Sequence, residues 1–160
     1  MTEAALSGTT HPILENDYAS EWMGIEVLAV TDGHATIRMT LRQEMLNGFG
    51  MAHGGMIFAF ADTAFALACN PVHPGPGDTD SITVAAGVDI NFLKPAYRGQ
   101  VVTAVADRRS SAGRSGLYDI QIFATDPAQT GSSPGSPFGA GQPGELIAEF
   151  RGRSRTIPKK

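Results

Sequence analysis

The segment 47–70 (NGFGMAHGGMIFAFADTAFALACN) most constrains how this chain can fold. Its first nine positions hold four glycines, and the apolar run that follows contains neither Gly nor Pro. A run of this kind is typical of a helix that is buried on most sides. Asp62 is the only formally charged residue within positions 45–77. The segment therefore predicts a long buried helix that carries a single carboxylate.

Asp62 has two interpretations, because a carboxylate rarely lies in a buried helix unless it is paired or has a chemical task. It could be a structural group that caps a loop or pairs with a basic residue. It could also be a catalytic group whose pKa is tuned by a dry site. Gly54 and Gly55 favour catalysis, because they stand where a helix N-terminus leaves backbone N–H groups unpaired. Such a terminus binds an oxyanion or a polarised carbonyl.

The spacing of these residues has a consequence for assembly. Asp62 lies seven residues beyond Gly55, which is two turns on and nearly the same helix face. The two positions are therefore about 10 Å apart along the axis. One carbonyl cannot touch both within a single chain. If both act on one substrate, two copies of the helix must face each other, and the site straddles a dimer interface.

The rest of the chain has the patterns of β-strands. Apolar and polar residues alternate clearly in 34–41, and Ala35, Ile37, Met39 and Leu41 are expected to point inward. The expected strands are 23–30, 34–41, 81–94, 100–109, 116–125 and 145–157. In 81–94 we expect Val84, Ala86, Val88, Ile90 and Phe92 to share one face. A short helix is expected in 13–23, with Asn16 or Asp17 as its cap. The pattern predicts an α+β fold, an antiparallel sheet of about six strands wrapped around one long helix.

The domain organisation follows from length and local composition. With 160 residues the chain is expected to form one domain, spanning 13–157, after a mobile N-terminus, 1–12. Twelve of the 18 residues in 127–144 are Gly, Pro or Ser and none is charged, so this segment is expected to be a flexible insertion in a hairpin. Residues 158–160 form a tail.

Composition excludes several classes of protein. A hydrophobic content of 42% is typical of a globular chain, and a formal net charge of −4 gives no basic field for nucleic acid. A single cysteine, Cys69, excludes an internal disulfide framework and is expected to pack as a small hydrophobe. Positions 1–10 lack the pattern of a secretory signal, and the apolar run is too short to span a bilayer, so a cytoplasmic location without membrane contact is expected. His11, His34 and His73 are expected at the surface.

Several ordered motifs resemble one known family. Asn47-Gly48, His53-Gly54-Gly55 and Asp62-Thr63-Ala64 are similar to the signature of hotdog-fold acyl-CoA thioesterases, and most of all to the PaaI group, which acts on phenylacetyl-type CoA thioesters. The resemblance continues in 90–95 (INFLKP), 116–120 (GLYDI) and 150–154 (FRGRS), and covers about 23–157. It implies a hotdog fold and a homodimer or a dimer of dimers.

The resemblance implies hydrolysis of an acyl-CoA thioester. The carbonyl would accept a hydrogen bond from the Gly54 N–H, with Gly55 helping, at the positive end of the helix dipole. Asp62 of the partner chain would activate water as a general base or attack the carbonyl directly. No metal or organic cofactor is implied, because coenzyme A is part of the substrate.

Other motif residues keep two interpretations. His53 is a helix cap or loop anchor, or, as in the family, it orients the loop or contacts the thioester sulfur. Asn47 is a turn residue, or it binds the acyl group or positions water. The family often places a Ser or Thr near Gly87 to hydrogen-bond the carboxylate or water, whereas this chain has Ala85-Ala86-Gly87. Thr63 and Thr83 are the hydroxyl residues that could take the place of this Ser or Thr.

The phosphates of coenzyme A require basic residues. Arg on an ordered strand or turn suits this task better than a solvated tail, which is the expected state of the last two lysines. The candidates are Arg98, Arg109, Arg114, Arg151, Arg153, Arg155, Lys159 and Lys160.

Two other functions fit the same motifs. Hydration or dehydration of acyl thioesters would need a His opposed to a carboxylate, and His53 could serve. A non-catalytic acyl-CoA-binding protein is the third possibility, but a binder gains nothing from an isolated carboxylate in a buried helix.

Overall fold

The computed structural model describes residues 11–77, 80–127 and 143–160. Within these residues the chain forms, in order, η2 (Pro12–Leu14), α1 (Tyr18–Met23), β1 (Glu26–Thr31), β2 (His34–Thr40), η3 (Gln43–Met45), α2 (Gly54–Cys69), β3 (Ser81–Phe92), β4 (Val101–Ala112), β5 (Ser115–Thr125) and β6 (Glu145–Pro158). The predicted strands and the long helix are all confirmed, with ends that shift by a few residues. No helix of the described residues is both long and apolar enough to cross a membrane.

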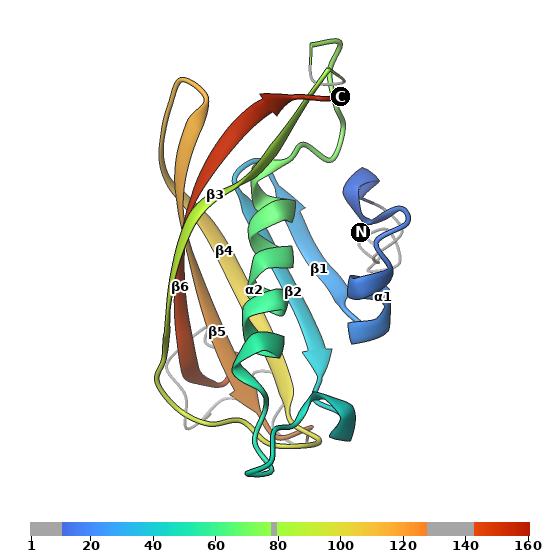
Figure 1. Cartoon of the computed structure of the whole chain (residues 1–160), viewed down its shortest axis with the longest axis vertical. Coiled ribbons are helices and arrows are strands. Elements are labelled where there is room, and N and C mark those ends of the chain that lie inside the picture. The colour runs from blue at the N-terminus through green and yellow to red at the C-terminus, as the bar shows by residue number, and fades with distance from the viewer. Residues whose placement is uncertain (1–10, 78–79, 128–142) are drawn as a thin grey trace.

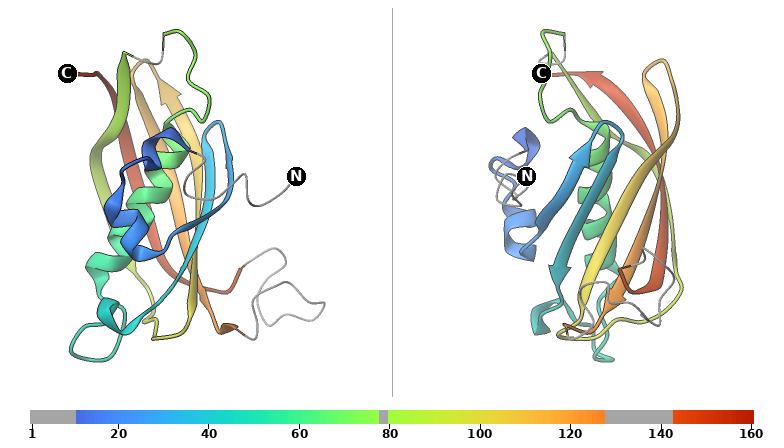
Figure 2. Two further views of the ribbon diagram at one scale, coloured as in Figure 1. Left: turned by 90° about the vertical axis from the view of Figure 1, so that its right-hand side faces the viewer. Right: turned by 180° about the vertical axis from the view of Figure 1, so that it is seen from behind.

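The strands of the described residues form one antiparallel sheet in the order β1-β2-β4-β5-β6-β3. The sheet curves around α2 (Figure 1), and two further views show α2 lying along its concave face (Figure 2). In the described part of the chain, β3 pairs with β6 alone and is therefore an edge strand. The predicted sheet wrapped around one helix is confirmed.

The core lies between α2 and the sheet, and Phe65 is near its centre. Its ring centroid is 5.3 Å from that of Tyr118 and 5.9 Å from that of Phe150, in tilted arrangements that aromatic pairs prefer. Gly152 on β6 lets the ring approach the backbone, because a Cβ there would lie 2.8 Å from the Phe65 Cε2. The inward residues predicted for β2 are buried as well, and so are Tyr118, Ile120 and Ile122, which alternate along β5.

The prediction that five apolar residues of β3 share one face is wrong. A bulge between Ala85 and Gly87 inserts one residue and exchanges the two faces of the strand. Val84 pairs with Arg155 on the outer face, whereas Val88 pairs with Gly152 on the inner face. Val84 is accordingly 37% exposed, and Val88 packs against the core.

The N-terminal part differs from its prediction in two respects. The expected helix over 13–23 is split into η2 and α1, and Asp17 caps α1 by accepting a hydrogen bond from the Ser20 N–H at 3.0 Å. His11 was expected at the surface but is only 2% exposed, so that prediction is wrong. Of the other two histidines, His73 is exposed, and the half-buried His34 hydrogen-bonds to Asp107 at 2.7 Å.

His11 is buried because its ring joins two segments. Its Nε2–H donates to the carbonyl oxygen of Asn70 at 3.1 Å, and its Nδ1 accepts from the Ile13 N–H at 3.2 Å. The Asn70 side chain in turn bonds to both backbone groups of Thr83, at 3.0 Å each. The start of β3 is thus fixed to the end of α2.

Parts of the predicted domain boundaries lie outside the described residues. Of the N-terminus predicted to be mobile, 1–10 is not described, and of the predicted insertion, 128–142 is not described. In the predicted tail, Pro158 still belongs to β6, and the Lys159 N–H donates to the Asp80 carbonyl oxygen at 2.9 Å.

Candidate active site

The loop before α2 is held by its own hydrogen bonds. The Asn47 Oδ1 accepts from the N–H groups of Phe49 at 2.9 Å and Met51 at 3.2 Å. The backbone N–H of Ala52 donates to Ala96 at 2.7 Å, and that of His53 donates to Met45 at 2.8 Å. These hydrogen bonds of the side-chain oxygen agree with the interpretation of Asn47 as a turn residue. Its amide nitrogen has no hydrogen-bond partner among the described residues.

His53 is the N-cap of α2. Its Nδ1 accepts a hydrogen bond from the Gly55 N–H at 3.2 Å, and its carbonyl oxygen accepts from Met56 and Ile57. A backbone N–H can only donate, so the neutral imidazole carries its proton on Nε2. The cap interpretation of His53 is confirmed. The Gly55 N–H, which was expected to help bind the carbonyl, is occupied by this cap.

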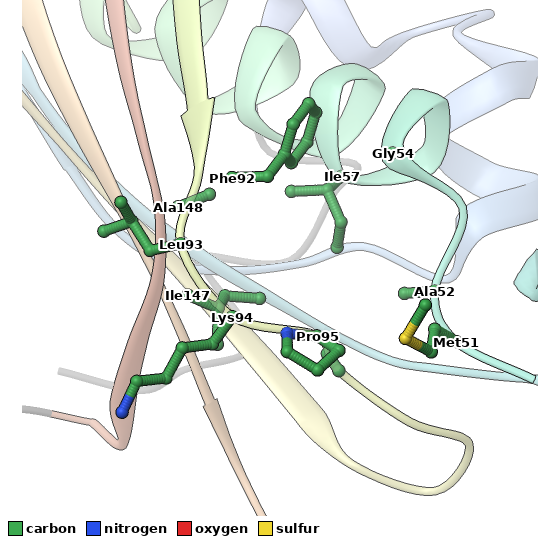
Figure 3. A pocket seen from close by; sticks show the side chains of 11 residues that line it. Met51, Ala52, Gly54, Ile57, Phe92, Leu93, Lys94, Pro95, Ile147 and Ala148 are labelled. Atoms are coloured by element: carbon green, nitrogen blue, oxygen red, sulfur yellow. The ribbon is translucent and has the colours of Figure 1, made fainter.

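Gly54 is the first residue of α2, and its N–H has no hydrogen-bond partner in the described part of the chain. It lines a pocket of about 320 Å³ (Figure 3), and small-molecule sites have volumes of roughly 300–1,000 Å³. The pocket is bounded by Met51, Ala52, Gly54, Ile57, Phe92, Leu93, Lys94, Pro95, Ala96, Ile147 and Ala148. Gly54, whose N–H is free at the positive end of the helix, therefore belongs to the lining of an apolar pocket.

Lys94 is the charged member of this lining, and its charge is balanced. Its Nζ forms an ion pair with Glu145, and in Figure 3 the side chain extends away from Gly54. The pocket thus has no uncompensated charge to attract a charged acyl group.

Asp62 is half-buried and lies eight residues after Gly54 on α2, which is about 12 Å along the axis. No hydrogen bond or ion pair to Asp62 is found among the described residues. Burial raises the pKa of its carboxyl group. Asp62 does not line the pocket beside Gly54, so one protomer does not bring the two predicted catalytic groups together.

Cys69 lies two turns beyond Asp62, and burial raises the pKa of its thiol to about 12. The thiol is therefore protonated near neutral pH and is a poor nucleophile. This agrees with its predicted packing role.

The two threonines predicted as substitutes do not contact Asp62 in the described protomer. The Thr63 hydroxyl donates to the Ala59 carbonyl oxygen at 3.2 Å and lies 3.1 Å from the Ser20 hydroxyl, so it joins α1 to α2. The Thr83 hydroxyl lies 2.8 Å from that of Thr156. Both serve the packing of elements.

The predicted phosphate-binding residues fall into separate regions. Arg98 lines a hollow beside Asn47 at the N-terminal end of α2, where its guanidinium donates to Gln43 at 3.0 Å. Arg151 and, to a smaller extent, Arg109 pair with Asp119 and hold the pKa of that carboxyl group below its usual range. Arg114 lies in the β4–β5 turn, at the opposite end of the sheet (Figure 1).

The pocket residues on β3 and β6 were missed as site residues from sequence. Phe92, Pro95 and Ile147 come from two segments far from Gly54 in the chain, and only strand pairing brings them together. The 90–95 motif was a signal that could have found the first two. Among the described residues, no group of three His, Cys, Asp or Glu side chains could hold a metal ion.

A sheet wrapped around a single long helix is the hotdog architecture, and here α2 has a free N–H at its start and, two turns later, a carboxylate without a partner among the described residues. The chain belongs to the thioesterase superfamily, whose family model matches residues 49–130. It is 34% identical to the acyl-coenzyme A thioesterase PaaI of Escherichia coli (strain K12) over 147 residues, covering 92% of this chain and 88% of that protein.

Solved structures agree with this assignment. The structure of E. coli PaaI matches with a TM-score of 0.73 and 33% identity, covering 92% of this chain and 90% of that chain. A variant of the phenylacetic acid degradation protein PaaI from Thermus thermophilus matches with a TM-score of 0.68 and 27% identity, covering 87% and 98% of the two chains. The predicted α+β hotdog fold and membership of the thioesterase family are confirmed.

Proposed function

We propose that this thioesterase hydrolyses an acyl-CoA whose acyl group is compact and uncharged, of the aryl-acetyl type. The observation that carries the proposal is the free Gly54 N–H at an apolar pocket of about 320 Å³. The pocket is large enough for an acyl group and offers it no net charge. The 34% identity to an acyl-coenzyme A thioesterase supports coenzyme A as the thiol.

In the proposed reaction the thioester carbonyl accepts a hydrogen bond from Gly54, and the helix dipole stabilises the oxyanion that forms. Two routes then lead to the products. In the first, Asp62 removes a proton from water as its oxygen attacks the carbonyl carbon. In the second, the Asp62 carboxylate attacks and water hydrolyses the resulting anhydride. In both routes the C–S bond breaks, and the thiolate leaves with its electron pair and is then protonated.

A second copy of the chain supplies Asp62 in this proposal. The separation of Gly54 and Asp62 along α2 excludes joint action on one carbonyl within a protomer. The edge strand β3 supports a dimer, because it carries exposed apolar residues, Ile82 (38%) and Val84 (37%), beside its unpaired edge. A homodimer is the minimum assembly, and a dimer of dimers is compatible with it.

Three further residues have proposed roles at the N-terminal end of α2. His53 keeps its Nε2–H exposed, where it can donate to the thioester sulfur. The Asn47 amide nitrogen can donate to the acyl group or to water. Arg98 lines the adjacent hollow with Asn47 and is proposed to bind a phosphate of coenzyme A.

Thiol release from a panel of aromatic and aliphatic acyl-CoAs tests the proposal, with Asp62→Asn beside the wild type. We expect kcat/KM to fall by a factor on the order of 10³ in the variant. Glu26→Gln is the matched control, because this exposed carboxylate lies on β1 and pairs with Arg38. Binding without thiol release by the wild type would identify a non-catalytic binder, and hydration of an enoyl-CoA would identify the hydratase alternative.

A further inference from the structure

The side chain of Phe92 lies beside Gly54, the residue proposed to supply the catalytic donor. Phe92 is the last residue of β3, and its ring points toward the start of α2 (Figure 3). A Cβ on Gly54 would lie 3.2 Å from the Phe92 Cζ, 3.5 Å from Cε1 and 3.6 Å from Cε2. The far end of the ring therefore rests directly against the residue whose N–H is proposed to hold the carbonyl.

The backbone at this position is fixed while the ring is accessible. The N–H groups of Leu93 and Lys94 both donate to the Ile147 carbonyl oxygen, at 2.7 and 3.2 Å. The Phe92 side chain is nevertheless 55% exposed, and its partner in the β3–β6 register is the small residue Ala148. The ring is therefore accessible to a ligand in the described protomer, while the strand backbone beside it is fixed.

The rest of the inner lining is rigid by comparison. Ile57, Ala148 and Ile147 are at most 4% exposed and belong to the packed core. These aliphatic side chains can limit the size of an acyl group, but they have no aromatic face. Phe92 supplies the aromatic face of the lining, next to the carbonyl position.

We propose that Phe92 determines which acyl groups this enzyme accepts, by packing its ring against a flat acyl group whose carbonyl is bound at Gly54. This inference rests on the proposed function and names the residue that selects the acyl group. Aromatic rings gain from edge-to-face and offset packing beyond the burial of area, and a flexible alkyl chain of similar size lacks that gain. Phe92 thus favours aryl-acetyl over alkyl thioesters.

The test compares kcat/KM for phenylacetyl-CoA and hexanoyl-CoA in the wild type, Phe92→Leu and Phe92→Ala. Leu retains an apolar wall without the aromatic face, so the ratio of the two kcat/KM values should fall about two- to tenfold. Phe92→Ala should lower this ratio at least as far, and it should also admit bulkier acyl groups. Tyr18→Leu is the matched control, because this aromatic residue is 71% exposed on α1, and its ratio should equal that of the wild type.

The failures of the two proposals are distinguishable. If the wild type releases thiol but Phe92→Leu keeps the wild-type ratio, or loses both activities equally, Phe92 does not select the acyl group while the thioesterase proposal stands. If the folded wild type releases thiol from no ester, the proposed function is wrong and this inference falls with it. Thermal unfolding of each variant verifies that the domain is folded.

Discussion

The Nδ1 atom of His53 accepts a hydrogen bond from the Gly55 N–H at 3.2 Å, and this bond distinguishes the first two N–H groups of α2. The Gly55 donor is satisfied within the chain, whereas the Gly54 donor has no partner among the described residues. Of these two N–H groups, the cap thus leaves only that of Gly54 free, at a helix start whose position is fixed.

Removing the cap should destabilise the domain. His53→Ala leaves the Gly55 N–H without its acceptor, and we expect the free energy of unfolding to fall by about 0.5–2 kcal/mol. His53→Asn should retain most of this energy, because Asn is a good N-cap. Denaturant unfolding measures both variants. Equal stability of His53→Ala and the wild type would contradict the capping role.

Gly54→Ala should lower thiol release while leaving the stability of the domain nearly unchanged. Ala favours a helix over Gly by about 1 kcal/mol, so the free energy of unfolding should not fall much. The new Cβ would press on the Phe92 ring at 3.2 Å, so thiol release should fall. In a Phe92→Ala background, the same Gly54→Ala change should lower thiol release by a smaller factor. Gly77→Ala is the control, because a Cβ at this position would meet no atom of the described residues within 4 Å. An equal loss with and without the Phe92 ring would show that the contact is unimportant.

Activity should depend on pH through Asp62. Burial raises the pKa of this carboxyl group above its ordinary value of 3.8, and the group must be ionised to act as base or nucleophile. The pH profile of kcat/KM should therefore fall on the acid side, with a midpoint above 3.8. A profile that stays flat down to pH 3.8 would contradict this role for Asp62.

Stability should depend on pH through His11. Burial lowers the pKa of this imidazole below its ordinary value of 6.5, so the folded chain keeps it neutral while the unfolded chain binds a proton. The free energy of unfolding should decrease as the pH falls from 6.5 toward the folded pKa. Denaturant unfolding across this range measures the slope. His11→Gln should reduce it, and an unchanged slope would show that His11 is not its source.

Local patterns predicted most of this fold, because alternation in β2 and the apolar run of α2 directly reflect which faces are buried. Long-range contacts could not be predicted in this way. His11 is buried by a bond to Asn70, 59 residues later in the chain. The bulge between Ala85 and Gly87 could not be predicted from a two-residue period, because apolar residues continue at every second position from Val84 to Phe92 across it. The pocket beside Gly54 likewise depends on the pairing of β3 with β6.

The central claim is that Gly54 of one chain and Asp62 of another act on the same thioester, and a mixing experiment tests it most directly. Gly54→Pro removes the N–H at the first helical position, where Pro is tolerated, and the extended backbone of His53 (φ −64°, ψ 132°) is compatible with a following Pro. Asp62→Asn removes the carboxylate. Each variant alone should be nearly inactive.

After the two variants are mixed, unfolded and refolded together, half of the dimers should be mixed at random assortment. Each mixed dimer should hold one site with both groups intact, so the account predicts recovery of about one quarter of wild-type thiol release. If the two groups act within one chain, every site lacks one of them. No recovery in correctly refolded mixed dimers would contradict the account.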